Sequence, residues 1–218
     1  MYKRVLSIDP APNNLGWSII EKIDDDNFNL LKYGLINLNK PSPCKKCDKP
    51  SFYFNFSEIE TIYCCKGHAQ EFSCNDKIKQ KTPEQISKSI IEKFDAVFNL
   101  DDFDFVIIEN QLAFRNIKSK NIQSFIIMYF TTKNKLIQCR NPTLKFFGKK
   151  FNKVGGNKYR ACKQFSVDAF ISLFGKDELN EMKQVLYTKK IDDVTDSILL
   201  GIQYLNNGTT PQSIISLL

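Results

Sequence analysis

The stretch Arg4-Val5-Leu6-Ser7-Ile8-Asp9 decides the fold. Its apolar residues and the turn-rich segment that follows at 10–14 predict a buried strand that ends in an acid. Two more strands are expected at 16–20 and 30–38. The connections between these three strands are short, so the N-terminal part of the chain is expected to form an antiparallel meander.

A helix and a second strand of the same kind follow. In Thr82-Pro83-Glu84-Gln85, a capping Thr precedes Pro at the first helical position and Gln comes three residues after the cap, which predicts a helix start. Residues 103–109 then predict another buried strand, which ends in Glu109. The remaining expected elements are a helix around 122–130, a strand near 136–139, and helices near 160–174, 176–187 and 192–205. This order predicts a mixed α/β sheet flanked by helices.

Length and composition favour one folded domain. The chain has 218 residues, of which 42% are hydrophobic, enough to bury a core. We expect a single domain over 1–218. An insertion at 39–81 interrupts it, because this segment does not continue the pattern of predicted strands and helices. No apolar run approaches the roughly 18 to 20 residues of a membrane span, and no signal peptide is evident. An intracellular protein with no membrane partner is therefore expected.

The positive charge is concentrated in one segment. Residues 110–167 contain 13 Lys and Arg and no Asp or Glu, whereas the whole chain has a net charge of +7. A local basic field attracts a polyanion, most commonly nucleic acid, although a Lys-rich solvated surface is the alternative. The residues expected to contact DNA phosphates are Arg115, Lys118, Lys120, Lys145, Lys149, Lys150, Lys153, Lys158, Arg160 and Lys163.

Four acids are expected to meet at one edge of the sheet. Asp9 and Glu109 each end a predicted central strand, and Asp193 and Asp196 are three residues apart on one helix face. Carboxylates at that density repel one another unless a cation lies among them, and hard oxygen ligands suit Mg²⁺ or Mn²⁺. Two such ions would serve phosphodiester hydrolysis. Asp9 could instead only begin a turn, and Asp192 and Asp193 could only favour a helix N-terminus.

The insertion contains a pattern typical of a zinc site. Cys44-Lys45-Lys46-Cys47 and Cys65-Lys66-Gly67-His68 each place two soft ligands at a turn, with 17 residues between them. Together Cys44, Cys47, Cys65 and His68 would fill the four tetrahedral positions of a structural Zn²⁺. Cys64 and Cys74 leave open a different set of four ligands. Cys139 and Cys162 lie outside the insertion and are expected in the core.

Three motifs in order resemble those of a known family. Ser7-Ile8-Asp9-Pro10 with Gly16, Ile108-Glu109-Asn110-Gln111, and the run from Lys189 to Ser197 are similar to motifs of the RuvC-like Holliday-junction resolvases, closest to the poxvirus and mitochondrial members. Ala11 stands where that family usually has Gly, and the doubled acid leaves open whether Asp192 or Asp193 is the ligand.

The resemblance implies an RNase H-like fold and a Mg-dependent endodeoxyribonuclease that acts as a homodimer on four-way DNA junctions. It also implies that Asp9, Glu109, Asp193 and Asp196 are catalytic metal ligands. A viral replication site in the host cytoplasm would suit the poxvirus-like motifs. The alternatives are another RNase H-like nuclease, of the RNase H or transposase type, and a non-catalytic zinc-bearing DNA-binding module.

Overall fold

The computed structural model describes residues 4–39, 44–47, 49, 51–56, 61–77, 81–113, 116–142, 158–186 and 191–216. The main sheet is built from β1 (Arg4–Asp9), β2 (Leu15–Lys22), β3 (Phe28–Ile36), β7 (Phe105–Glu109) and β8 (Leu136–Arg140). The helices are α1 (Pro83–Val97), the 3-10 helix η1 (Leu100–Asp102), α2 (Ile117–Thr132), α3 (Lys158–Phe174), α4 (Lys176–Val185), α5 (Asp192–Leu205) and α6 (Gln212–Ile215).

The main sheet is mixed, in the order β3-β2-β1-β7-β8. β1, β2 and β3 pair antiparallel, which confirms the expected meander. β7 then adds parallel to β1, with Ile8 opposite Ile108, and β8 adds parallel to β7. The carboxyl ends of β1, β7 and β8 therefore lie at the same edge of the sheet.

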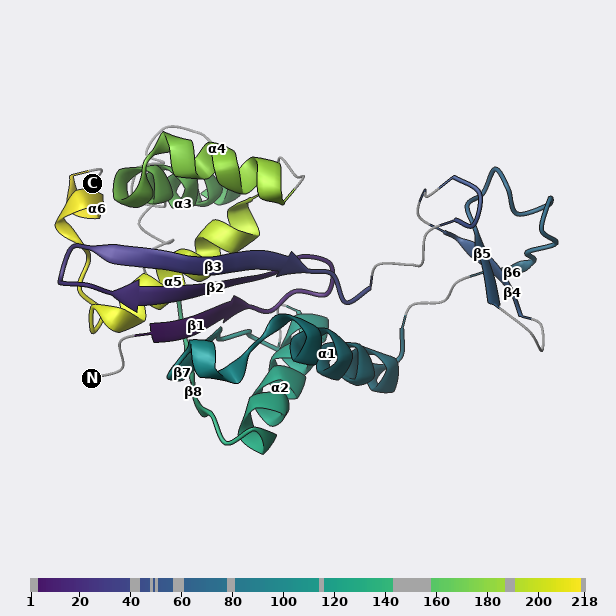
Figure 1. The fold of residues 1–218 in the computed structure, drawn as a ribbon, viewed down its shortest axis with the longest axis horizontal. Coiled ribbons are helices and arrows are strands. Elements are labelled where there is room, and N and C mark those ends of the chain that lie inside the picture. Colours follow the sequence, from purple (N-terminus) through teal and green to yellow (C-terminus); the bar gives the residue numbers. More distant parts are fainter. Residues whose placement is uncertain are drawn as a thin grey trace.

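Helices cover both faces of this sheet. α1 and α2 pack on one face, where Phe94 and Phe130 join Ile8 and Ile108 in one buried cluster. α3, α4 and α5 lie on the opposite face, where Phe170 packs with Ile107 in a second cluster (Figure 1). Successive side chains of β1 and β7 point to opposite faces and contribute to one cluster or the other, as expected for strands buried on both faces.

Helix α1 begins as the sequence predicts. The Thr82 hydroxyl accepts a hydrogen bond from the backbone N–H of Gln85 at 3.3 Å, and the Gln85 side chain accepts one from the Thr82 N–H at 3.0 Å. This reciprocal capping satisfies two N–H groups at the helix start.

Among the described residues, no helix is both long and apolar enough to cross a membrane.

A second, three-stranded sheet lies between β3 and α1 in the chain. Its strands are β4 (Tyr53–Phe56), β5 (Thr61–Cys64) and β6 (Asp76–Lys77), in the order β5-β4-β6. Figure 1 shows it apart from the main sheet. All three strands fall within the insertion proposed at 39–81.

The prediction of core positions for the last two cysteines was wrong. Cys139 is exposed and Cys162 is only partly buried. Cys139 lies on β8, which is an edge strand of the main sheet. The side chains of an edge strand are covered by fewer neighbours than those of a central strand, so an apolar pattern alone overestimates their burial.

Candidate functional site

Two of the predicted acids end neighbouring parallel strands. Asp9 is the last residue of β1 and Glu109 the last of β7, each directly after the register pair Ile8 and Ile108. Side chains alternate along a strand, so both acids project from the face opposite these two isoleucines, which is the face covered by α5. Glu109 is 8% exposed. The two carboxylates therefore belong to one row on the α5 side of the sheet.

The first turn of α5 lies directly against this row. Gly16 is the register partner of Asp9 on β2, and a Cβ atom on Gly16 would overlap the carbonyl group of Asp193. At the other end of the helix, a Cβ atom on Gly201 would lie 2.7 Å from Ile20 Cδ1. Glycine at both positions lets α5 lie close along β2. The main chain of Asp193 is thereby brought beside the strand pair that carries Asp9.

The acids of α5 surround one lysine. Lys163 Nζ lies 3.0 Å from Asp192 Oδ2, 3.3 Å from Asp193 Oδ1 and 2.8 Å from Asp196 Oδ2. Burial alone would lower the pKa of Lys163, but the charges of Asp196 and Asp193 and the hydrogen bonds to Asp196 and Asp192 raise it well above its ordinary value. Lys163 is therefore a charged ammonium group that compensates the carboxylates. The role expected for Lys163 from the sequence, a contact to a DNA phosphate, stays a prediction.

Asp196 is the most buried of the three acids around Lys163. Its side chain is 2% exposed, and Ser166 Oγ donates a hydrogen bond to Asp196 Oδ1 at 2.6 Å. Ser166 and Lys163 both lie on α3, so this helix fixes both carboxylate oxygens of Asp196. Sequence reasoning missed Ser166. No local pattern marks Ser166, because its burial and its contact with Asp196 arise from the packing of α3 on α5.

A second missed residue, Gln123, supports the segment after Glu109. Gln123 is 1% exposed, and its Oε1 accepts hydrogen bonds from the Gln111 backbone N–H at 3.1 Å and from Lys120 Nζ at 3.0 Å. The Gln111 side chain in turn donates to Asp9 Oδ1 at 3.5 Å. Helix α2 thus holds the loop that follows Glu109, and this loop contacts Asp9 through the Gln111 side chain. A Gln beside Ile122 on the apolar face of α2 was the sequence signal.

Most of the expected phosphate contacts lie outside the described side chains. Lys118 is exposed and Lys120 is partly buried at the start of α2. Arg115, Lys145, Lys149, Lys150 and Lys153 lie outside the described residues, as do the side chains of Lys158 and Arg160 in α3.

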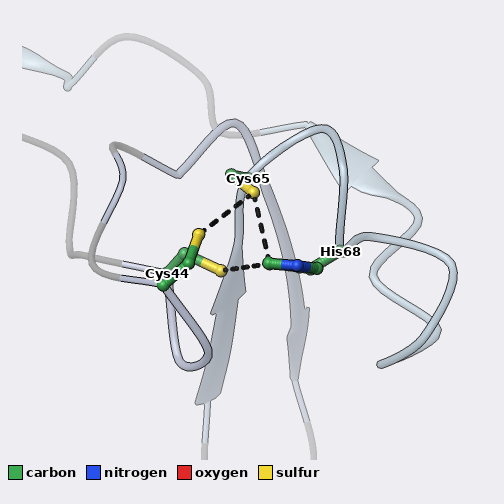
Figure 2. Close-up of side chains that lie close together, drawn as sticks. Cys44, Cys65 and His68 are labelled. Carbon is green, nitrogen blue, oxygen red and sulfur yellow. Dashed lines mark hydrogen bonds between the residues drawn. The ribbon is translucent and has the colours of Figure 1, made fainter.

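The four predicted zinc ligands converge. The ligand atoms of Cys44, Cys47, Cys65 and His68 all lie within 4.8 Å of one another. His68 Nδ1 is 3.5 Å from both Cys44 Sγ and Cys65 Sγ, and Cys47 Sγ is 3.7 Å from Cys65 Sγ (Figure 2). Tetrahedral ligands at zinc bond lengths stand about 3.4 to 3.8 Å apart. The side chains present therefore fit a tetrahedral ion.

The two spare cysteines of the insertion differ in environment. Cys64 and Cys74 are buried with their sulfur atoms 3.0 Å apart. Burial raises the pKa of Cys64 to about 12, whereas a backbone hydrogen bond from Cys65 is the main reason that the pKa of Cys44 falls to about 5. The Cys64 sulfur contacts Cys74 and is not part of the group of four ligand atoms that lie within 4.8 Å of one another, so the geometry favours Cys44 over Cys64 as a ligand.

Comparison with known proteins gives two viral relatives. A fowlpox virus protein named Holliday junction resolvase is 35% identical over 106 residues, 48% of this chain and 59% of the relative. An uncharacterized protein of Acanthamoeba polyphaga mimivirus is 27% identical over 197 residues, 73% of this chain and 46% of the relative. The chain thus spans about half the length of these curated relatives.

Two solved structures share the fold. A fowlpox virus resolvase, solved as a complex with substrate Holliday junction DNA, has a TM-score of 0.51 and 20% identity, over 93% of this chain and 99% of that chain. The yeast mitochondrial Holliday junction resolvase has a TM-score of 0.54 and 13% identity, over 98% and 82%. At these identities the likeness establishes the fold, and it confirms the expected RNase H-like mixed sheet.

The family follows from a match over most of the chain. Residues 58–207 match the family model described as Poxvirus A22 protein. This range contains Glu109, Asp193 and Asp196, as well as α3 with Lys163 and Ser166. The chain belongs to the poxvirus A22 protein family.

Proposed function

We propose that this protein is a Holliday-junction resolvase, an endonuclease that hydrolyses phosphodiesters symmetrically at four-way DNA junctions. The observation that carries the proposal is the row formed by Asp9 and Glu109 on neighbouring strands, with the first turn of α5 packed against it at Gly16. The fowlpox relative named as a Holliday junction resolvase supports this substrate.

The proposed metal ligands are Asp9, Glu109, Asp193 and Asp196. Their carboxylate oxygens are the donors that Mg²⁺ or Mn²⁺ prefers. Two bound ions would supply an activated water and stabilise the leaving oxygen. We keep Asp193 rather than Asp192 as the ligand, because the main chain of Asp193 lies against Gly16 beside Asp9.

The protein groups around the acids have separate roles in this proposal. Ser166 orients Asp196, and Gln111 orients Asp9. Lys163 compensates the carboxylate charge when no divalent ion is bound. The phosphates of the DNA arms would be held by the basic segment at 110–167, from which Lys118 and Lys120 present ammonium groups at the start of α2.

The remaining parts of the proposal concern zinc, assembly and location. Cys44, Cys47, Cys65 and His68 would hold a structural Zn²⁺ that folds the insertion at 39–81. A homodimer would place two active sites for paired cuts, and exposed apolar side chains at Ile91 on α1 and Met128 on α2 are available for such an interface. The viral relatives favour action where viral DNA is replicated in the host cytoplasm.

A cleavage assay on three substrates tests the proposal. Purified protein is incubated in Mg²⁺ with a four-way junction, a linear duplex of matched sequence, or an RNA–DNA hybrid. We expect symmetric nicks in the junction alone, and we expect Asp9→Asn and Glu109→Gln each to slow cleavage at least about 100-fold while junction binding persists. Preferential cleavage of the hybrid or of duplex ends would instead assign another RNase H-like activity. Binding without any cleavage would leave a DNA-binding module.

A further inference from the structure

Residue Arg140 ends the third parallel strand of the main sheet, in the same row as the two strand-end acids. In the pairing of β7 with β8, Glu109 lies opposite Arg140. Neighbours in a register pair project from the same face of a sheet, so Arg140 and Glu109 face the α5 side together. The burial of Ile137 agrees with this orientation. Ile137 lies three residues before Arg140 on β8, so it projects from the opposite face, where it packs with the α1 and α2 cluster. The row along this edge therefore runs Asp9, Glu109, Arg140.

The backbone of Arg140 is fixed to the loop that follows Glu109. Its carbonyl oxygen accepts a hydrogen bond from the Asn110 N–H at 2.8 Å, and Asn110 Nδ2 donates to Asn141 Oδ1 at 3.1 Å. The Arg140 side chain is exposed on this anchored backbone. The Arg140 side chain thus starts from a defined backbone position, opposite that of Glu109, and is not buried by the fold.

A groove begins at Arg140 and continues along α5. It has a volume of about 410 Å³, within the range of pockets that hold ligands. The polar side chains that line it include Gln138, Arg140, Gln203 and Asn207. Among the described residues, this lining contains a guanidinium group and three amide side chains, and no acid. Such donors suit phosphate oxygens and base edges.

The most basic part of the sequence follows the strand that lines this groove. Arg140 comes directly before 141–167, which contains seven of the thirteen basic residues of the acid-free segment. A strand of DNA leaving the acids at Glu109 would meet Arg140 first. The next parts of the protein along its path would be the amides of Gln138 and Gln203.

From this arrangement we propose that the groove between β8 and the second half of α5 is a binding site for one strand of the DNA substrate, with Arg140 holding a phosphate close to the bond that is cut. The inference rests on the proposed nuclease function and names a strand path for it. Arginine suits this task because its planar guanidinium group can donate two parallel hydrogen bonds to a phosphate.

The first test measures junction binding against salt concentration in an Asp9→Asn background. Adding Arg140→Gln should weaken binding and lower the slope of log affinity against log salt by about 0.9, the value for one lost phosphate contact. Arg140→Lys should restore most of the slope. The matched control is Lys88→Gln, which removes an exposed charge from α1 and should leave the slope unchanged. An unchanged slope for Arg140→Gln would overturn the inference.

A second test reads the strand path directly. A photoreactive p-benzoylphenylalanine at position 138 is irradiated in the complex with the junction. Crosslinks should map to the nucleotides beside the cleaved phosphate, and crosslinks confined to distant arm positions would contradict the strand path. Wild-type cleavage of the three substrates is measured alongside. Loss of the proposed function would show as absence of junction cleavage by the wild type, whereas failure of this inference alone would leave that cleavage intact.

Discussion

The carbonyl group of Asp193 lies against Gly16, so closely that no side chain can stand between α5 and β2 at this point. Because Gly16 is the register partner of Asp9, this contact sets how near the acids of α5 come to the strand-end acids. The candidate site therefore depends on a residue that carries no functional group.

Replacing Gly16 tests this dependence. Gly16→Ala should destabilise the fold by about 1 to 3 kcal/mol through overpacking, and it should weaken Mn²⁺ binding because the backbone of Asp193 must move. Thermal denaturation and metal titration measure the two effects. Gly201→Ala is the control, since its closest contact would be the flexible end of the Ile20 side chain and not the main chain of Asp193. If Gly16→Ala bound Mn²⁺ as well as Gly201→Ala, the helix contact would not control the site.

Strand-end acids were predictable because two local signals agreed. The apolar run before Asp9 and the run before Glu109 each predict a buried strand, and the shared edge of parallel strands follows from the α/β pattern. The spacing of Asp193 and Asp196 predicts one helix face. These parts of the site depend only on the spacing of residues along a strand or helix and on the direction of the strands.

Other features depend on tertiary contacts that no local pattern reveals. Lys118 and Lys163 look alike in a charge count, but no local pattern reveals that three carboxylates surround Lys163, which follows from the packing of α3 on α5. The register that places Arg140 beside Glu109 is set by the pairing of β7 with β8. The strands of the insertion lie near the cysteine cluster and are too short to show a clear alternation of apolar and polar residues.

The zinc cluster makes a prediction about individual cysteines. Cys44→Ser should reduce bound zinc from one ion per chain to a small fraction and should unfold the insertion, because three ligands hold the ion poorly. Zinc is measured by elemental analysis of the purified protein. Cys64→Ser should retain a full equivalent of zinc, since its sulfur contacts Cys74 rather than the ligand set. Full zinc content in Cys44→Ser would refute the assignment.

A tyrosine and an aspartate on neighbouring helices give a prediction about pH. Tyr129 on α2 donates a hydrogen bond to Asp95 on α1 at 2.7 Å, and this bond, with one from Lys133, lowers the pKa of Asp95. A carboxyl group with a lowered pKa stabilises the fold above its unfolded value of about 3.9, and that contribution is lost as pH falls through the lower folded value.

Acid titration of two variants tests this pH dependence. Between about pH 5 and pH 2, the wild type should lose more stability than Tyr129→Phe, in which the pKa of Asp95 returns toward its ordinary value. Urea unfolding at a series of pH values measures the difference. Asp95→Asn is the matched control. It removes the carboxyl group together with its bonds to Tyr129 and Lys133, so its slope should be reduced at least as much as that of Tyr129→Phe. Parallel acid profiles of wild type and Tyr129→Phe would show that the hydrogen bond has no such effect.

The contacts of Lys163 predict how the protein behaves without metal. Its ammonium group lies 2.8 Å from Asp196 and also pairs with Asp192 and Asp193, and the Lys163 side chain is 20% exposed. Lys163→Met would leave these carboxylates without their counter-charge. We expect the free energy of unfolding of the metal-free protein to fall by about 2 to 3 kcal/mol, which allows for the partial exposure of Lys163 and its partners.

Added Mg²⁺ should then stabilise Lys163→Met more than it stabilises the wild type, because the divalent ions supply the missing positive charge. Thermal denaturation with and without Mg²⁺ measures both effects, and Lys163→Arg, which keeps the charge, should behave like the wild type. Equal stabilisation of Lys163→Met and wild type by Mg²⁺ would show that the lysine and the divalent ions do not share these carboxylates.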